Sequence, residues 1–185
     1  SSVNNRKATK ELGEPNHNGN AGGKSAWWAF TAPADGDLWV STTNSTFDTL
    51  LGLYMGNQVA GLSTLASNDD AYDQAPGGFS SLTYAVRSNQ TYRVAVDGYD
   101  GVSGVVFLSH QFTPATVYRV TVNSTDGGFV SPATMDVLSN STAVIAATPA
   151  QFFAFDGWTG SSPASADPRS VVVNSNLSLM AHFKP

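Results

Sequence analysis

The stretch that decides the fold is residues 79–112, which read FSSLTYAVRSNQTYRVAVDGYDGVSGVVFLSHQF. Three runs rich in Val, Tyr, Thr and Leu lie near 79–87, 91–97 and 104–112. Turn signals separate them, first Ser88-Asn89-Gln90 and then Asp97-Gly98-Tyr99-Asp100-Gly101. Short runs of β-branched and aromatic residues bounded by Gly, Asn and Asp are typical of strands. The stretch therefore predicts three consecutive β-strands.

The same pattern extends towards the N-terminus. It predicts strands near 25–32, 37–43, 49–55 and 59–66, with Ala34-Asp35-Gly36-Asp37 as one of the turns. No segment of a dozen residues keeps an apolar period of about 3.6 residues, so helices are not expected. Regularly spaced short strands predict an all-β fold, an antiparallel sandwich or barrel.

A second strand pattern begins after residue 116. Its strands are predicted near 117–123, 127–131, 142–147, 152–158, 169–173 and 177–183. A Pro-containing segment, 113–116, separates it from the first pattern. We therefore predict two domains, residues 1–112 and a small β-rich module at 117–185. About 70 residues make only a small core, which we expect to be filled by the aromatics Phe129, Phe152, Phe153, Phe155, Trp158 and Phe183.

Composition excludes several classes of protein. The 185 residues carry a net charge of −5 and contain no cysteine. There is no apolar run of about 18 residues, so membrane insertion is not expected. An acidic chain without a basic patch does not predict nucleic-acid binding, and we expect a monomer. Because the chain starts at Ser1 without Met, we expect a removed signal peptide or a fragment of a longer protein.

Acidic residues concentrate in a loop between two predicted strands. Asp48 begins one strand, and the loop contains Asn68, Asp69, Asp70 and Asp73. Loop ends of adjacent strands could bring these oxygens together, and Ca²⁺ takes six to eight oxygen ligands. The sequence thus predicts a calcium site at Asp48, Asn68, Asp69, Asp70 and Asp73. The alternative is that Asp and Asn simply form turns and solvate the loop.

Strand alternation separates inward from outward aromatic rings. In Leu38-Trp39-Val40, the two aliphatic residues share one face, so Trp39 points to the other. An outward Trp on a sheet is a candidate platform for a ligand. With the loop aromatics Tyr72 and Tyr99, it forms the predicted ligand-binding set. Trp27 also points away from Trp28, but we expect it to be covered by a neighbouring strand, the N-terminal segment or the second module.

Catalytic signatures are missing. Gly101-Val102-Ser103-Gly104 lacks the spacing of a nucleophile elbow, and no His has a second His at metal-ligand spacing. No phosphate loop or dinucleotide fingerprint is present. We therefore expect no enzymatic activity.

Several segments of the first domain resemble a known family. In order they are Ala8–His17, Gly22–Pro33 (GGKSAWWAFTAP), Phe47–Tyr54 (FDTLLGLY), Asn68-Asp69-Asp70 and Tyr92–Tyr99 (YRVAVDGY). Over about residues 4–112 they resemble the bacterial pre-peptidase C-terminal domain family. The resemblance implies a jelly-roll-like β-sandwich that trails a catalytic domain in a secreted hydrolase. Related collagen-binding modules bind calcium through a Glu-rich N-terminal segment, which implies a second calcium candidate at Glu11, Glu14 and Asn16.

Lys24 stands where that second candidate would need an acidic ligand. A salt bridge from Lys24 to Glu11 or Glu14 is the simpler expectation.

The second domain resembles the divergent internalin-type B-repeat family. The resemblance rests on Tyr118–Val122, Gly127–Val130, Ala147–Ala150, Phe155–Gly160 and Met180–Phe183. Where that family usually has Gly before its aromatic, this chain has Phe152. Because positive φ strains a residue with a side chain, we expect the local backbone to differ there.

Together these features predict a non-catalytic accessory pair from a secreted or surface bacterial protein. It would hold a catalytic domain of the same polypeptide near a polymeric substrate, a polysaccharide or a fibrous protein. The alternative is a structural spacer or adhesin segment with no ligand of its own.

Overall fold

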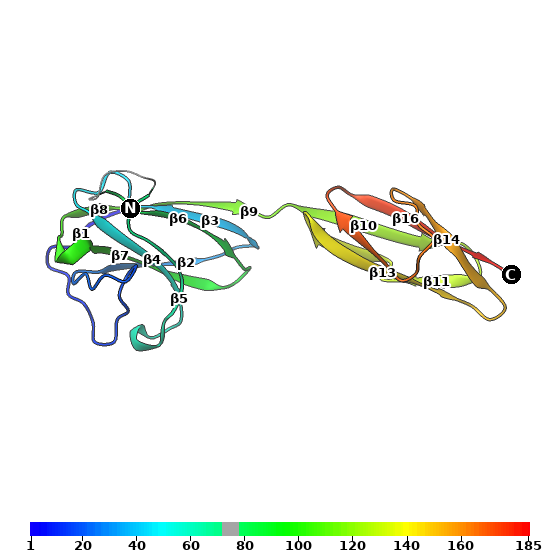
Figure 1. The fold of residues 1–185 in the computed structure, drawn as a ribbon, viewed down its shortest axis with the longest axis horizontal. Helices are drawn as coiled ribbons and strands as arrows, with labels where there is room; N and C mark the ends of the chain where they lie inside the picture. The colour runs from blue at the N-terminus through cyan, green and yellow to red at the C-terminus, as the bar shows by residue number, and fades with distance from the viewer. Residues whose placement is uncertain (72–77) are drawn as a thin grey trace. The chain divides into compact units, whose positions relative to one another are not determined.

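The computed structural model describes residues 1–71 and 78–185, and these form two compact units, Ser1–Pro114 and Ala115–Pro185 (Figure 1). Apart from two 3-10 turns, Val59–Gly61 and Tyr99–Gly101, the described elements are strands. The predicted all-β class is confirmed. Among the described residues, no helix is long and apolar enough to cross a membrane.

The first unit contains two main antiparallel sheets. Their strand orders are β2-β7-β4-β5 and β6-β3-β9. The strands are β2 (Ala26–Thr31), β3 (Gly36–Ser41), β4 (Thr49–Met55), β5 (Ser63–Asn68), β6 (Ser81–Val86), β7 (Thr91–Gly98) and β9 (Ser109–Pro114). A further antiparallel pair is formed by β1 (Ser2–Asn4) and β8 (Val105–Phe107).

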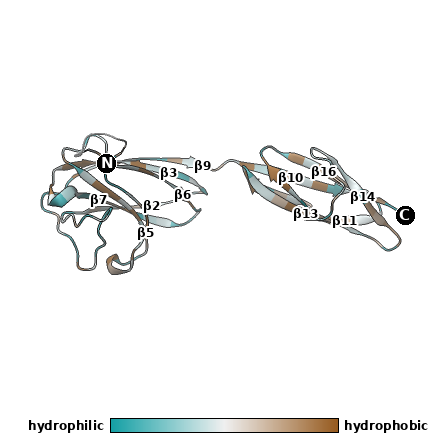
Figure 2. Ribbon diagram, viewed as in Figure 1, coloured by the Kyte–Doolittle hydropathy of each residue, from teal (hydrophilic) through white to brown (hydrophobic). Residues whose placement is uncertain are grey.

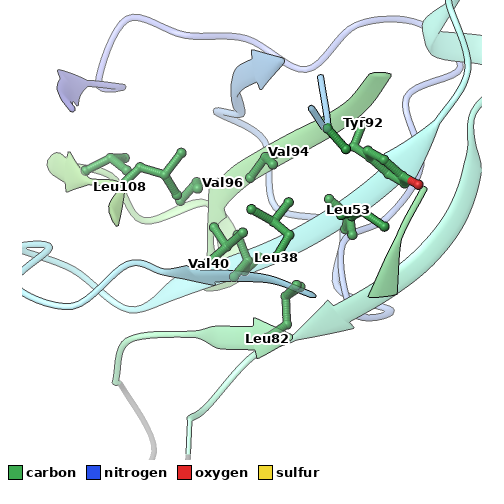
Figure 3. Close-up of a cluster of buried hydrophobic side chains, with 12 residues drawn as sticks. Leu38, Val40, Leu53, Leu82, Tyr92, Val94, Val96 and Leu108 are labelled. Carbon is green, nitrogen blue, oxygen red and sulfur yellow. The ribbon is translucent and has the colours of Figure 1, made fainter. Parts of the chain in front are cut away.

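The core of the first unit lies between these two sheets. Leu38 and Val40 of β3 pack in one cluster with Leu53 of β4 and with Val94 and Val96 of β7 (Figure 3). Each such buried aliphatic side chain contributes about 1.5–3 kcal/mol relative to exposure. Because side chains alternate along a strand, the residues between these positions point away from the core. The ribbon coloured by hydropathy shows hydrophobic residues interspersed with more polar ones along the strands (Figure 2).

Two strand predictions in the first unit were wrong in detail, and one strand was not predicted. The predicted strand 59–66 begins with a 3-10 turn, and β5 starts only at Ser63. The predicted strand 104–112 is two strands that meet at Leu108, because β8 pairs with β1 whereas β9 pairs with β3. Leu108 exchanges two backbone hydrogen bonds with Ser1, each 2.9 Å long. The short strand β1 was not predicted.

The second unit is a smaller arrangement of two sheets. The strand orders are β12-β10-β16-β14 and β11-β13-β15, with one parallel pair, β10 and β16. The strands are β10 (Val117–Ser124), β11 (Gly128–Ser131), β12 (Thr134–Leu138), β13 (Ser141–Pro149), β14 (Ala154–Gly160), β15 (Arg169–Val173) and β16 (Leu177–Lys184). Of these, β12 was not predicted from the sequence.

The aromatic core predicted for the second unit is only partly correct. Trp158 is buried, and Phe155 and Phe183 pack against the buried cluster. Phe129, Phe152 and Phe153, however, are exposed. Aliphatic residues from both sheets fill the space instead, and they include Val120, Val122, Ile145, Val173 and Leu179.

Phe152 keeps the backbone that its family position would give to Gly. Its φ is 70°, and it lies in a turn closed by a hydrogen bond of 3.1 Å from the Phe153 N–H to the Ala150 carbonyl. The expectation of a different local backbone is therefore wrong. A positive φ costs a bulky residue about 1–2 kcal/mol, and the ring recovers little by packing because it is 83% exposed.

Candidate functional site

Trp39 lies in the middle of β3 and points away from the core. Leu38 and Val40 on either side of it are buried, whereas Trp39 is 39% exposed. β3 is the central strand of the sheet β6-β3-β9, so neighbouring strands flank the ring on both sides. The outward orientation predicted from the sequence is thus present in the structure.

The neighbours of Trp39 across the sheet are small and polar. Thr83 of β6 and Gln111 of β9 are its register partners, and both are exposed. Directly opposite residues lie on the same face of a sheet. The face therefore presents one large ring between a hydroxyl and an amide.

A hollow of about 250 Å³ lies beside Trp39. It is lined by Trp39, Asn68, Ala71, Ser81, Leu82 and Thr83. The Asn68 amide oxygen accepts a hydrogen bond of 2.8 Å from the Ser81 N–H. The Asn68 amide nitrogen donates one of 3.1 Å to the Asp70 carbonyl. Asn68 thus connects the hollow to the acidic loop.

Three carboxylates of the predicted calcium site converge. Asp48, Asp69 and Asp70 each offer an oxygen, and these oxygens lie within 4.8 Å of one another. Burial, followed by the negative charges of Asp69 and Asp70, raises the pKa of Asp48. Burial and the charge of Asp70 likewise raise the pKa of Asp69. The cluster is therefore electrostatically unfavourable without a positive charge.

One oxygen of Asp48 is left without a partner. Its Oδ1 is buried, and no described residue gives it a hydrogen bond. By contrast, Asp70 Oδ1 accepts a hydrogen bond of 3.2 Å from the Gly78 N–H. Asn68 was predicted as a ligand of the same calcium site. Its side-chain amide instead makes the two hydrogen bonds to Ser81 and Asp70 that hold the loop.

The other members of the predicted sets are more dispersed. Tyr72 and Asp73 lie outside the described residues. Tyr99 is 41% exposed and lies in the turn after β7, a strand of the other sheet from Trp39. Its backbone N–H donates a hydrogen bond of 3.1 Å to the Asp48 carbonyl. Tyr99 thus adjoins the acidic cluster and does not share the sheet face of Trp39.

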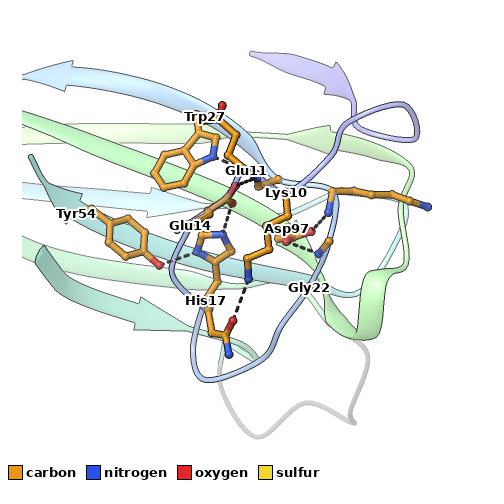
Figure 4. Close-up of polar contacts among 12 residues, drawn as sticks. Lys10, Glu11, Glu14, His17, Gly22, Trp27, Tyr54 and Asp97 are labelled. Carbon is orange, nitrogen blue, oxygen red and sulfur yellow. Dashed lines mark hydrogen bonds and ion pairs between the residues drawn. The ribbon is translucent and has the colours of Figure 1, made fainter. Parts of the chain in front are cut away.

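A buried polar network that the sequence did not predict covers the other sheet. The N-terminal segment, residues 5–25, contributes His17, whose Nδ1 lies 2.6 Å from the Tyr54 hydroxyl and whose Nε2 lies 3.1 Å from Glu14 Oε1 (Figure 4). Because an ionised carboxylate only accepts, Nε2–H donates to Glu14 and the Tyr54 hydroxyl donates to Nδ1. The Trp27 ring lies 5.7 Å from the His17 ring and 5.5 Å from that of Tyr54. Trp27 is thus covered by the N-terminal segment, as expected.

Asp97 fixes the far end of the same segment. Its carboxylate accepts hydrogen bonds from the N–H groups of Gly23 (2.7 Å), Lys24 (2.8 Å) and Gly98 (2.7 Å). Gly22 has a φ of 54°, and a side chain there would collide with the Asp97 carboxylate. The segment therefore needs glycine beside a buried acid.

Electrostatics inside this network are set by burial and hydrogen bonding. Burial lowers the pKa of His17, although Glu14 acts in the opposite direction. Burial alone would raise the pKa of Glu14, but hydrogen bonds from Ser25, the Glu11 backbone and His17 lower it overall. Burial raises the pKa of Tyr54 to about 12. His17 is therefore neutral and Glu14 ionised at neutral pH.

These contacts contradict one expectation about the N-terminal segment and give no support to a second. The predicted salt bridge from Lys24 is not formed, since the Lys24 ammonium contacts Ser103 Oγ at 3.1 Å. The second calcium candidate is also not supported. Glu14 is engaged by His17 and by the Glu11 N–H, and the Lys10 ammonium lies 2.9 Å from the Asn16 amide oxygen.

Two family models match the chain, in the order expected from the sequence. Residues 24–98 match the bacterial pre-peptidase C-terminal domain, and residues 118–185 match the divergent InlB B-repeat domain. Both are non-catalytic accessory modules that typically occur in extracellular bacterial proteins. Trp39 and the three converging carboxylates fall within the first match. No curated protein and no solved structure matches the chain.

Proposed function

We propose that this chain, a bacterial pre-peptidase C-terminal domain followed by a divergent InlB B-repeat, is a non-catalytic binding pair of a secreted or surface bacterial protein. Its first unit would hold a polymeric substrate, a polysaccharide or a fibrous protein, on the outer face of β6-β3-β9. A catalytic domain of the same polypeptide would then stay close to that polymer. Tethering of this kind raises the effective concentration of substrate without new chemistry.

The observation that carries this proposal is the exposure of Trp39 at the centre of an open sheet face. Of the four Trp residues, Trp158 is buried, and Trp27 and Trp28 are less exposed than Trp39. The outer face of the other sheet is occupied by the N-terminal segment through His17 and Asp97. Within residues 1–71 and 78–114, nothing covers the outer face of β6-β3-β9, and the largest apolar group of that face, Trp39, lies in its middle.

Depletion binding tests this proposal. Purified protein is mixed with insoluble polysaccharides and insoluble collagen, and the protein left in solution is measured. We expect retention on at least one polymer and a loss of at least about tenfold in affinity for Trp39→Ala, as for a central aromatic anchor. Trp39→Phe should keep part of the affinity because it keeps a ring.

Val144→Ala is the matched control, because Val144 is an exposed, outward strand residue of the second unit. It should bind like the unmodified chain. Retention by neither the unmodified chain nor its variants would contradict the proposal and favour the spacer alternative. Equal retention by Trp39→Ala would place the site elsewhere and contradict the role of this face.

We also propose that Asp48, Asp69 and Asp70 hold a calcium ion. The specific observations in favour are their convergence and the buried Asp48 Oδ1, to which no described residue gives a hydrogen bond. A divalent cation would neutralise the repulsion that raises the pKa of Asp48 and Asp69. Carboxylate and carbonyl oxygens are the ligands that Ca²⁺ prefers. Its role would be to stabilise the loop that reaches the hollow beside Trp39.

A further inference from the structure

Resting on the proposed function, we infer that the polymer held at Trp39 is an uncharged polysaccharide. The inference comes from the side chains that surround the ring. The outward positions of the face are Asp37, Trp39, Ser41, Ser81, Thr83, Ala85, Ser109, Gln111 and Thr113. They include no Lys or Arg, and Asp37 is their one charged member. A polymer of anionic sugars would find no cation on this face.

The two ends of β3 strengthen the argument against an anionic polymer. At the Gly36 end, Arg87 is already paired with Asp35 at 3.3 Å. At the Ser41 end lies the acidic loop, which is joined to β6 by the hydrogen bond from Ser81 to Asn68. The face is thus bordered by carboxylates at one end and a neutralised pair at the other. Three carboxylates around the proposed divalent cation keep a net charge of about −1, so the Ser41 end does not favour a negatively charged polymer even with calcium bound.

The same residues argue against a fibrous protein. The buried centre of a protein–protein interface is apolar and depleted of charged residues, with several aromatic or aliphatic anchors. Here Trp39 stands alone, and its direct cross-strand neighbours are Thr83 and Gln111. A protein partner would bury these polar groups around a single apolar anchor.

A sugar chain suits this combination. One face of a pyranose ring is a plane of C–H groups that packs on an indole, while its edge carries hydroxyls that need donors and acceptors. Thr83 supplies a hydroxyl, and Gln111 supplies both an amide donor and an acceptor. The neighbouring hollow, about 250 Å³, can take one further sugar ring beside Ser81 and Thr83. No ion pair is needed, so binding should be nearly independent of salt.

The test measures retention of the full chain on three kinds of polymer at low and high salt. The uncharged probes are cellulose, xylan, mannan and chitin; the anionic probes are polygalacturonate and heparin–agarose; the protein probe is insoluble collagen. We expect retention on at least one uncharged polysaccharide, with an affinity that changes by less than about twofold with salt.

Two substitutions ask whether the polar neighbours contribute. Gln111→Ala and Thr83→Val should each weaken retention by about three- to tenfold, the loss expected for one hydrogen bond. Thr148→Val removes an exposed strand hydroxyl from the second unit and should have no effect. Circular dichroism would show that each variant is folded.

The outcomes separate this inference from the proposed function. Retention on collagen alone, or salt-sensitive retention on an anionic polymer, would overturn the inference while leaving a binding module. Retention on uncharged polysaccharide that Gln111→Ala and Thr83→Val both leave unchanged would overturn the role of the polar face. Retention on no polymer would overturn the inference together with the proposed function.

Discussion

The two units are both built from packed β-sheets, but they differ in what they bury. Every buried polar or charged side chain among the described residues belongs to the first unit; these are Asn5, Glu14, His17, Ser25, Ser41, Thr42, Thr49, Ser80 and Asp97. The buried residues of the second unit are all hydrophobic. In the first unit, many of these buried polar side chains attach the N-terminal segment to one sheet.

The difference explains which face is free. In the first unit, the N-terminal segment covers the sheet that carries Tyr54 and Asp97, and the sheet with Trp39 stays open. The second unit has no such cover, and Phe129 of β11 and Val144 of β13 remain exposed on its smaller sheet. The proposed ligand site lies on the open one of these two sheet faces of the first unit.

The largest expected effect comes from removing the acid that anchors the cover. Asp97→Ala leaves three backbone N–H groups without their acceptor in a buried place. We expect the free energy of unfolding of the first unit to fall by about 3–5 kcal/mol. Urea unfolding with pulsed hydrogen exchange measures it, because peptides report on each unit separately.

Asp156→Ala is the matched acid in the second unit. Asp156 forms an exposed ion pair with Lys184 at 2.6 Å, and its loss should cost less than about 1 kcal/mol. Equal losses for the two substitutions would contradict the contrast between a polar and an apolar interior.

Calcium should stabilise the first unit selectively. A ligand that binds only the native state at about 100 times its Kd adds about 2.7 kcal/mol of stability. Asp48→Asn should abolish this gain, yet raise stability in chelator because it removes a carboxylate from a repulsive cluster. Melting with calcium, with magnesium and with chelator measures both effects. Asp126→Asn in the second unit should behave like the unmodified chain. If calcium does not raise the melting temperature of the first unit, the proposal of a bound calcium ion is contradicted.

Acid should weaken the first unit more than the second. Burial lowers the pKa of His17 below 6.5, so the unfolded chain binds a proton on this residue at a higher pH than the folded chain does. Stability is therefore lost as pH falls below 6.5. Glu14 adds a further loss of stability, because its pKa is lowered in the folded chain. This loss begins as pH falls below 4.5 and continues until pH has passed through the lowered pKa. Asp48 and Asp69, whose pKa values are raised, act in the opposite direction near that lower range.

The difference in acid sensitivity between the two units is measured by urea unfolding at a series of pH values. Each sample is then labelled by hydrogen exchange at one fixed pH. A first unit whose stability is constant or rises between neutral pH and pH 5 would contradict the assignment of a neutral, buried His17.

The smallest expected effect concerns the turn at Phe152. Phe152→Gly removes the strain of a positive φ and should stabilise the second unit by about 0.5–1 kcal/mol. Phe152→Ala keeps that φ and should give no gain, which separates strain from loss of the ring. Urea unfolding of the two variants makes the comparison. A stability loss with Gly would mean that the exposed ring packs in solution.

The parts predictable from the sequence were those set by local pattern. Strand alternation placed Leu38 and Val40 inside and Trp39 outside, and the loop ends brought Asp48 close to Asp69 and Asp70. Turn residues marked most strand ends within two positions. Alternation describes one strand at a time, so it could not show which of the five Phe rings of the second unit the opposing sheet would cover.

The parts that escaped prediction depend on long-range pairing. His17 meets Tyr54 across 37 positions of sequence, and nothing local distinguishes a buried His from a solvated one. The strand 104–112 divides because Ser1 pairs with Leu108, a partner more than one hundred residues away. The one available signal was the glycine pair Gly22-Gly23, whose acidic partner Asp97 lies within β7, 74 positions from Gly23.

Chemical footprinting of Trp39 in the free and in the polymer-bound protein tests the central claim most directly. Trp39 is the most exposed Trp of the chain, so hydroxyl radicals, which modify both Trp and Phe, should oxidise it first among the Trp residues of the free protein, as read by mass spectrometry of its peptide. The account predicts that Trp39 is protected when the protein is bound to the polymer, whereas an exposed residue of the second unit such as Phe152 keeps its accessibility. Oxidation of Trp39 at the same rate in bound and free protein would contradict it.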